Sequence, residues 1–196
     1  MFLFIDHDDY EFAWRHRPIL KFDGGAYNQD TCFPDQATDS NNNVCKKFNP
    51  TAPIYYKIIQ CGNFLKLVWH VWYGLQRPCI GNFGGRGNNW ERIIINFVKE
   101  NGAWVQDSFT FYQHEGWYTR KTRSNQPNPE VWVGKISHGS YDTGCDGKLS
   151  WKLLSIEYCQ GGCGYWDDFR NANPKTEWFP TNIQALSKVS GEDVTR

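Results

Sequence analysis

The sequence has no excess of charge of either sign. Its 196 residues include 21 lysines and arginines and 21 aspartates and glutamates, so the formal net charge is zero. A balanced chain creates no large electrostatic field that would attract nucleic acid or an anionic membrane. The composition therefore argues against nucleic acid as a partner.

The sequence also lacks a long hydrophobic run. The opening residues, Met-Phe-Leu-Phe-Ile-Asp, are apolar over only a few positions and carry no basic leader. Such a stretch is too short for a signal peptide or a membrane-spanning helix. No N-glycosylation motif is present, because proline occupies the middle of Asn49-Pro50-Thr51. We expect no transmembrane segment, and if the protein is secreted, we expect its signal to lie outside this sequence.

Cysteine is abundant, with seven residues, most of them beside glycine, proline, asparagine or aspartate. This usage is typical of disulfide-bonded proteins in an oxidising, extracellular compartment. Proximity along the chain suggests three bonds: Cys32 with Cys45, Cys61 with Cys79, and Cys145 with either Cys159 or Cys163. Sequence alone does not establish connectivity, and an odd number leaves one cysteine unpaired or available for self-association.

Aromatic residues make up 17% of the chain, a load that suits strands and leaves some rings for stacking on a ligand. Leu65–Tyr73 alternates strictly between two faces, and Arg92–Val98 repeats this pattern. Alternation of this kind predicts strands with one face in a core. Asn101-Gly102 predicts a hairpin turn after the second of these strands.

Further strands are expected over 12–22, 54–60, 104–113, 131–137 and 151–158, and one short helix over 181–189. Many short strands separated by Gly/Pro turns, with no internal repeat and no linker, predict a single domain over residues 1–196. The expected fold is a mostly β, antiparallel β-sandwich with long loops and one or two short peripheral helices.

Three polar clusters lie at expected strand ends: Asn88–Glu91, Gln113–Gly116 and Ser137–Asp142. We expect the first to lie on a loop, where rigid strands often position functional side chains. If the strands after Glu91 and before His114 form a hairpin, these two residues share one end of the sheet. A strand over 131–137 that runs in the direction of 104–113 would bring His138 to the same end.

The resulting ring of Glu91, His114, His138 and Asp142 has three interpretations. Two histidines with carboxylates can bind a divalent cation, with Glu91, His114 and His138 as ligands. The same groups can act as general acid and base. Alternatively, each histidine is a hydrogen-bonded loop residue with no chemical role. His70 lies inside a strand among aromatic residues and is interpreted as structural.

The clusters resemble a known family. Gly85–Glu91 reads Gly-x-x-x-Asn-Trp-Glu, Gln113–Gly116 reads Gln-His-x-Gly, and Ser137–Tyr141 reads Ser-His-Gly-x-Tyr. Together with Arg17–Leu20 and Cys32–Pro34, they are similar to the necrosis-inducing (Nep-like) proteins. They are more similar still to relatives of the vacuolar-protein-sorting-sixty-two type, over most of residues 18–142.

The resemblance implies a β-sandwich flanked by short helices. In the toxic members it implies binding to a sphingolipid sugar head at a plant membrane, helped by a divalent cation such as Ca²⁺ or Mg²⁺, followed by lysis. Trp90 and Glu91 match the family motif. The departures are Asn89 for the family's aspartate, Arg86 and Asn88 for its histidines, and Tyr73–Gln76 for its Tyr-x-x-Pro-Lys-Asp.

A hard cation prefers charged oxygens, and Asn89 supplies only a neutral one. The resemblance therefore implies a weakened cation site and argues against cytolysis of that kind. Glu91 would instead hold its surroundings through hydrogen bonds.

Three functions remain open. The first, which we favour, is a secreted, non-catalytic protein that binds a glycan or a lipid head group. Its expected ligand-binding residues are Asn88, Asn89, Glu91, His114, His138, Asp142 and Trp117. The second is a hydrolase that uses His114, His138 and Glu91. The third is an extracellular structural or assembly subunit linked through the unpaired cysteine.

Overall fold

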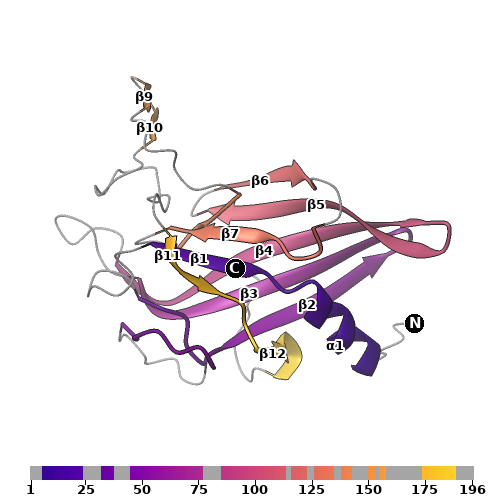
Figure 1. Cartoon of the computed structure of the whole chain (residues 1–196), viewed down its shortest axis with the longest axis horizontal. Helices are drawn as coiled ribbons and strands as arrows, with labels where there is room; N and C mark the ends of the chain where they lie inside the picture. The colour runs from indigo at the N-terminus through magenta and orange to yellow at the C-terminus, as the bar shows by residue number, and fades with distance from the viewer. Residues whose placement is uncertain are drawn as a thin grey trace.

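The computed structural model describes residues 6–23, 32–37, 45–76, 85–113, 116–122, 126–134, 138–142, 150–152, 155–157 and 174–188. These residues form a β-sandwich, as the sequence predicts (Figure 1). The larger sheet has the order β12 (Asn182–Ala185), β2 (Pro53–Cys61), β3 (Phe64–Gln76), β4 (Arg86–Glu100), β5 (Ala103–Gln113) and β6 (Gly116–Lys121). The smaller sheet has the order β11 (Pro174–Trp178), β1 (Ile19–Asp23), β7 (Glu130–Val133) and β8 (Ser140–Tyr141).

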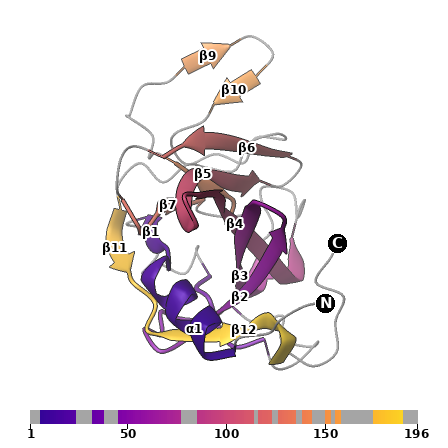
Figure 2. The same ribbon diagram turned by 90° about the vertical axis from the view of Figure 1, so that its right-hand side faces the viewer.

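Neighbouring strands in both sheets are antiparallel except for one pair in each. β12 runs parallel to β2, and β1 runs parallel to β7. Figure 2 shows β1 and β11 facing the larger sheet across the core. Outside the two sheets, β9 (Ser150–Lys152) and β10 (Ser155–Glu157) form a separate pair, so the strand expected over 151–158 is two shorter strands.

The alternation in β3 determines which face of the larger sheet is the core face. Leu65, Leu67, Trp69, Val71 and Tyr73 are all buried in one hydrophobic core, which also includes Leu20, Phe22 and Val131 of the smaller sheet. Burying each large apolar side chain contributes roughly 1.5–3 kcal/mol. Because β4 also contributes side chains to this core, the core holds the polar residues of β4 in place.

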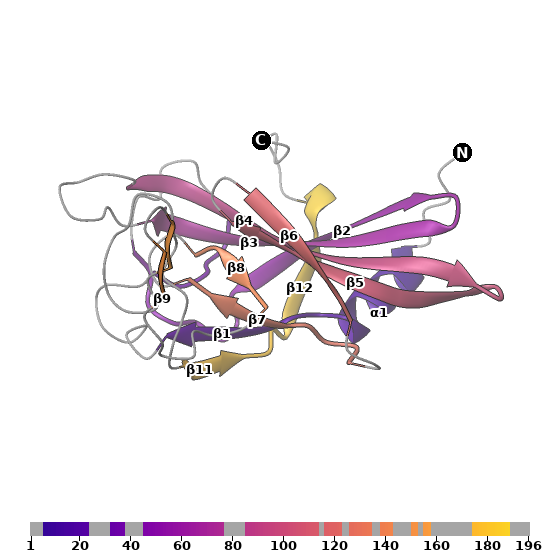
Figure 3. The same cartoon turned by 90° about the horizontal axis from the view of Figure 1, so that it is seen from above.

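The β4–β5 hairpin follows the prediction from Asn101-Gly102. The turn residues Asn101 and Gly102 have φ angles of 47° and 84°, and Glu100 pairs with Ala103. A two-residue hairpin turn with positive φ angles has a twist that matches that of the flanking strands. Glycine adopts a positive φ angle without steric cost. Figure 3 shows this hairpin and the β2–β3 hairpin projecting at the same end of the molecule, past the smaller sheet.

The structure corrects the prediction of an extended segment over 12–22. The helix α1 (Asp6–Arg15) comes first, and β1 begins only after Pro18. Phe12 and His16 are four residues apart and both contact the ring of Phe97, at centroid distances of 4.9 Å. Helical spacing is what brings both rings to one core residue.

The helix expected over 181–189 is also wrong in part. Asn182–Ala185 forms β12, and only the 3-10 helix η3 (Leu186–Lys188) follows it. β12 pairs with Pro53–Tyr56 of β2. A short isolated helix is marginal in water, whereas the edge of β2 supplies partners for the backbone of this segment.

One predicted disulfide is confirmed and another is wrong. Cys32 and Cys45 are bonded, whereas Cys61 is a free, exposed thiol at the end of β2. Cys79, the partner predicted for Cys61, lies outside the described residues. The bond expected between Cys145 and either Cys159 or Cys163 lies outside the described residues.

Arg17 attaches the end of α1 to the segment after β11. Its guanidinium lies 3.7 Å from the ring centroid of Trp14 and 3.7 Å from that of Phe179. It also donates a hydrogen bond of 2.6 Å to the Trp14 carbonyl oxygen. A planar cation between two aromatic faces is well suited to such a position, because both of its faces are used.

We predict that Arg17→Ala lowers the free energy of unfolding by about 1–3 kcal/mol, because both ring contacts are lost. Urea denaturation followed by tryptophan fluorescence measures the change. Arg15→Ala, at an exposed position in the last turn of α1, is the control and should change stability little. Equal losses in both variants would contradict a stabilising role for the ring contacts.

His70 lies on the opposite face of β3 from the core, beside the rings of aromatic residues. Its ring is 6.2 Å from that of Trp90, which is 5.5 Å from that of Tyr55. Burial lowers the pKa of His70 to about 4, and the charges of Arg92 and Lys57 lower it in the same direction. The ring is therefore neutral in the folded protein at physiological pH.

This pKa predicts a loss of stability in acid. Between pH 6.5 and pH 4 the unfolded chain protonates His70 and the folded chain does not, so the free energy of unfolding falls by about 3 kcal/mol over this range. His70→Gln should lack this part of the fall. Denaturation midpoints measured at several pH values for both proteins test it, and parallel curves would show that the fold does not hold His70 neutral.

Candidate ligand-binding site

The cluster Asn88–Glu91 lies within β4 rather than on a loop, which corrects the expectation from sequence. Asn89 pairs with Tyr73 and Glu91 pairs with Val71 on the neighbouring β3. Since Val71 and Tyr73 belong to the core face, register places the side chains of Asn89 and Glu91 on that face as well. Asn89 and Glu91 therefore continue the core rather than line an open rim.

His138 reaches the same place from the smaller sheet. It follows β7 and precedes β8, and its φ angle is 66°. A backbone hydrogen bond of 2.8 Å from the Gly134 N–H to the Gly139 carbonyl closes the connection. The imidazole stacks on the ring of Tyr73, with centroids 3.9 Å apart and planes 5° from parallel. A left-handed backbone at a residue other than glycine is uncommon, and here it aims the ring between the sheets.

Asn89 joins the carboxylate to the imidazole. Its Nδ2 donates to Oε1 of Glu91 at 3.0 Å and lies 3.2 Å from Nδ1 of His138. Because an amide nitrogen donates, Nδ1 of His138 accepts in this contact. Two residues of β4 and one from the loop before β8 thus form one hydrogen-bonded group across the sandwich.

All three side chains of this group are buried, with exposed fractions of 0% for Asn89, 6% for Glu91 and 1% for His138. A buried carboxylate is costly unless hydrogen bonds satisfy it, so the Asn89 amide stabilises Glu91. The structure brings Glu91 and His138 together, as the sequence suggests, but inside the molecule.

The described side chains of this group do not fit a hard divalent cation. Asn89 directs an N–H donor toward both Glu91 and His138, where a cation would need lone pairs. Among the described residues, no group of three or more histidines, cysteines, aspartates or glutamates is arranged to hold a metal ion. His114, the third expected ligand, lies outside the described residues.

Asp142 and Asn88 lie near the group but have other surroundings. The Asp142 carboxylate accepts a hydrogen bond of 2.7 Å from the Tyr118 hydroxyl and forms an ion pair of 3.0 Å with Arg120. These contacts connect the end of β8 to β6. Asn88 is half-buried and has a φ angle of 53°. Asp142 thus joins the two sheets, and the described contacts do not include it in the Asn89 group.

Trp117 is on the other face of the larger sheet. It pairs with Tyr112 on β5, and Tyr112 lies beside Arg92 of β4, whose guanidinium is 5.9 Å from the tyrosine ring. The exposed fraction of Trp117 is 65%, whereas Tyr112 and Arg92 are half-buried. We call these three residues the aromatic strip. Sequence analysis identified Trp117 but missed Tyr112 and Arg92, whose shared face depends on the register across three strands.

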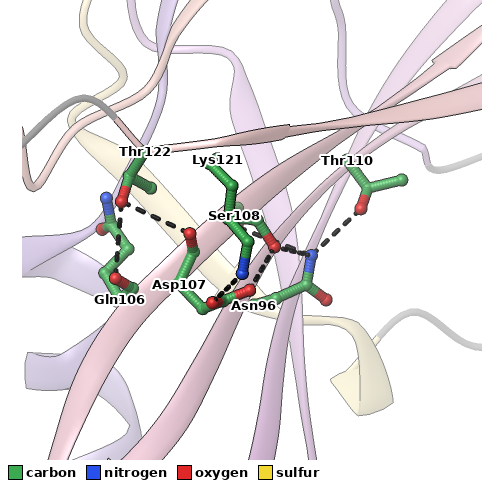
Figure 4. A network of polar contacts seen from close by, with 7 residues as sticks. All are labelled: Asn96, Gln106, Asp107, Ser108, Thr110, Lys121 and Thr122. Atoms are coloured by element: carbon green, nitrogen blue, oxygen red, sulfur yellow. Dashed lines mark hydrogen bonds and ion pairs between the residues drawn. The ribbon is translucent and has the colours of Figure 1, made fainter.

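A hydrogen-bonded network, shown in Figure 4, connects β4, β5 and β6 next to the aromatic strip. The Asn96 amide donates to the Thr110 hydroxyl at 3.0 Å and to the Ser108 hydroxyl at 3.3 Å. Thr110 in turn shares a hydrogen bond of 2.9 Å with Thr119, two residues from Trp117 on the same face. Lys121 is paired with Asp107 at the far end of the network. These contacts hold β4, β5 and β6 in one register and so hold the strip in one arrangement.

The site residue that sequence analysis assigned only to the core is Tyr73. Its ring supports the imidazole of His138. The available signal was the alternation that places Tyr73 last in the core-facing series of 65–73. That signal predicts burial but not the partner, because His138 arrives from the other sheet.

No protein-family model and no curated protein matches the sequence. Solved structures do share its fold. NLPPya in complex with glucosamine has a TM-score of 0.51 and 14% identity, over 68% of this chain and 65% of that one. A structure described as a toxin fold for microbial attack and plant defense has a TM-score of 0.53 and 10% identity, over 91% of this chain and 74% of that one. A mutant of NLPPya has a TM-score of 0.52 and 12% identity, over 68% and 66%.

At these identities the likeness concerns the fold alone. The protein therefore has an NLP-like toxin fold, and it spans 65% of the length of the NLPPya chain that was solved with glucosamine. The closer similarity to relatives of the vacuolar-protein-sorting-sixty-two type stays a prediction. No helix in the described part of the chain is long and apolar enough to cross a membrane.

The role of Asn89 as a neutral donor leads to a prediction. Asn89→Asp replaces the amide N–H with a second buried carboxylate facing Glu91, and we expect a loss of about 2–4 kcal/mol in the free energy of unfolding at pH 7. The loss should shrink toward pH 5, since protonating one carboxyl group restores a donor.

Asn88→Asp, at the half-buried neighbouring position, is the control and should cost much less. Denaturation is measured for both variants in EDTA and again with Ca²⁺ or Mg²⁺ added. A wild type that gains stability from either ion would contradict our conclusion that the amide takes the place of a cation.

Proposed function

We propose that the protein is a secreted, non-catalytic β-sandwich that binds a glycan, or the sugar head group of a glycolipid, through the aromatic strip. The observation that carries this proposal is the exposure of Trp117, at 65%, beside Tyr112 and Arg92 on a sheet face held rigid by hydrogen bonds. Sugars present apolar C–H faces that stack on aromatic rings, and their hydroxyls bond to polar groups nearby.

Several features of the strip suit a sugar. Trp117 offers an open ring face, and the Arg92 guanidinium can donate hydrogen bonds to hydroxyl or carboxylate oxygens. Thr119 adds a hydroxyl two residues from Trp117. Since Asn96, Thr110 and Thr119 hold the strands together, binding would require little ordering of the protein, which favours affinity.

The fold and the disulfide support the rest of the proposal. One solved protein with this fold, NLPPya, was obtained in complex with glucosamine. The Cys32–Cys45 bond suits an oxidising compartment and therefore an extracellular location.

A hydrolase is less well supported by the described residues. Glu91 and His138 would have to contact substrate, yet both are buried and both are engaged by Asn89. A catalytic acid or base must come within hydrogen-bond reach of the reacting atoms. The buried group is better suited to joining the two sheets than to turnover.

The proposal predicts a specific loss of binding. A glycan array identifies the sugars that bind, and calorimetry with the best of them measures affinity. Trp117→Ala should weaken that affinity by about tenfold or more, because the stacking surface is removed. An array with no positive sugar, together with no binding to glycolipid vesicles, would refute the proposal.

Phe64→Ala is the matched control. Phe64 has the same exposure as Trp117, 64% against 65%, and lies on the same face of the sheet. Through Val98, Phe64 lies level with Val105 of β5. The stretch of β5 from Val105 to Tyr112 therefore places the strip about 23 Å from Phe64. The control should bind sugar as the wild type does, and an equal loss in both variants would indicate a general effect of removing an aromatic residue.

A further inference from the structure

The two hairpins that project past the smaller sheet carry a row of side chains on the outer face of the larger sheet. Register pairs Cys61 with Phe64, Phe64 with Val98, and Val98 with Val105 across β2, β3, β4 and β5. Residues that are directly paired across strands project from the same face. We call these four residues the tip row.

The tip row is apolar and open to solvent. Phe64, Val105 and Cys61 are exposed, and Val98 is half-buried. Ile59, two residues before Cys61 on β2 and paired with Lys66, extends the exposed apolar surface on the same face. An exposed phenylalanine among aliphatic side chains is unfavourable in water, and contiguous patches of this kind mark interaction sites. The surface also contains the free thiol of Cys61.

Charges of opposite sign border the row on its two sides. Lys66 lies two residues after Phe64 on β3, toward the middle of the sheet. Glu100 lies two residues after Val98 on β4, toward the hairpin turn. Both side chains are exposed and, by alternation, share the face of the tip row. The surface therefore has a positive border, an apolar centre and a negative border.

We propose that the tip row is the contact surface of a symmetric dimer of this chain. A two-fold axis along the row places every residue of the row opposite its own counterpart. The same rotation brings the Lys66 border of one copy over the Glu100 border of the other. A two-fold interface must be self-complementary in this way. The axis also brings Cys61 of each copy face to face.

The size of the surface explains why the thiol matters. Stable interfaces bury about 800 Å² per partner, which is more than five side chains supply, so the apolar contact alone gives weak association. A bond between the two Cys61 residues makes the contact intramolecular and thereby raises its effective concentration.

The bond forms by thiol–disulfide exchange with a low-molecular-weight disulfide such as oxidised glutathione. The Cys61 thiolate of one copy attacks the glutathione disulfide, forms a mixed disulfide and releases one glutathione thiol. The Cys61 thiolate of the second copy then attacks the mixed disulfide and releases the second glutathione thiol. Two protein thiols are oxidised, and one glutathione disulfide is reduced to two thiols.

The experiment follows formation of the covalent dimer. The full chain is incubated with oxidised glutathione, and the initial rate is measured by non-reducing electrophoresis with peptide mapping of the bond. We expect a Cys61–Cys61 dimer that Cys61→Ser abolishes. Phe64→Ala should lower the rate about tenfold, since it removes the largest apolar contact. Trp117→Ala, equally exposed but far from the row, is the control and should leave the rate unchanged.

A charge exchange tests the geometry of the axis. Lys66→Glu places like charges across the interface and should slow dimer formation several-fold, as should Glu100→Lys. The double variant Lys66→Glu/Glu100→Lys restores opposite charges and should recover the wild-type rate to within about twofold. The recovery should weaken at high salt, because the borders are exposed.

Several outcomes would overturn the proposal. These are a dimer that persists in Cys61→Ser, a rate unchanged by Phe64→Ala, or a double charge variant slower than either single one. Loss of vesicle binding in Phe64→Ala while the wild type stays monomeric under oxidation would identify the row as a membrane contact instead. Sugar binding by Trp117 is measured separately, so either proposal can fail without the other.

Discussion

The antiparallel pairing of β3 with β4 determines where the functional side chains of this protein lie. One face of this pair continues the hydrophobic core into Tyr73, Asn89 and Glu91. The other face carries Arg92 toward Tyr112 and Trp117 at one end and Phe64 and Val98 at the other. A shift of β4 by one residue would exchange its two faces, placing the Glu91 carboxylate in solvent and Val98 of the tip row on the core face.

The buried group of Asn89, Glu91 and His138 illustrates what one amide does inside a sandwich. A carboxylate and an imidazole from different sheets meet there, and the amide donates to both. This arrangement makes the contact between the sheets specific, because each polar group requires its partner. Asn89, which stands where the Nep-like motif has an aspartate, therefore connects the two sheets through its amide.

The outer face of the larger sheet separates two surfaces of different chemistry. The aromatic strip near β6 lies beside a polar network that includes Asn96, Thr110 and Thr119, whereas the tip row is an apolar surface between two charged borders. A rigid surface next to polar groups suits a small polar ligand. An apolar row between charges of opposite sign suits a second copy of the chain. An extracellular protein with both surfaces would present its sugar-binding sites in pairs.

The sequence by itself determined that the fold is mostly β, the alternation of β3 and β4 and the Asn101-Gly102 turn, because each depends on residues close together in the chain. It could not determine that Asn89 and Glu91 are interior, nor that α1 and β12 replace an expected strand and helix. Those outcomes depend on partners from distant segments: Phe97 for α1, β2 for β12 and His138 of the β7–β8 connection for Asn89. Strand register, which only the folded sheet establishes, decided which polar residue faces the core and which aromatic residue faces water.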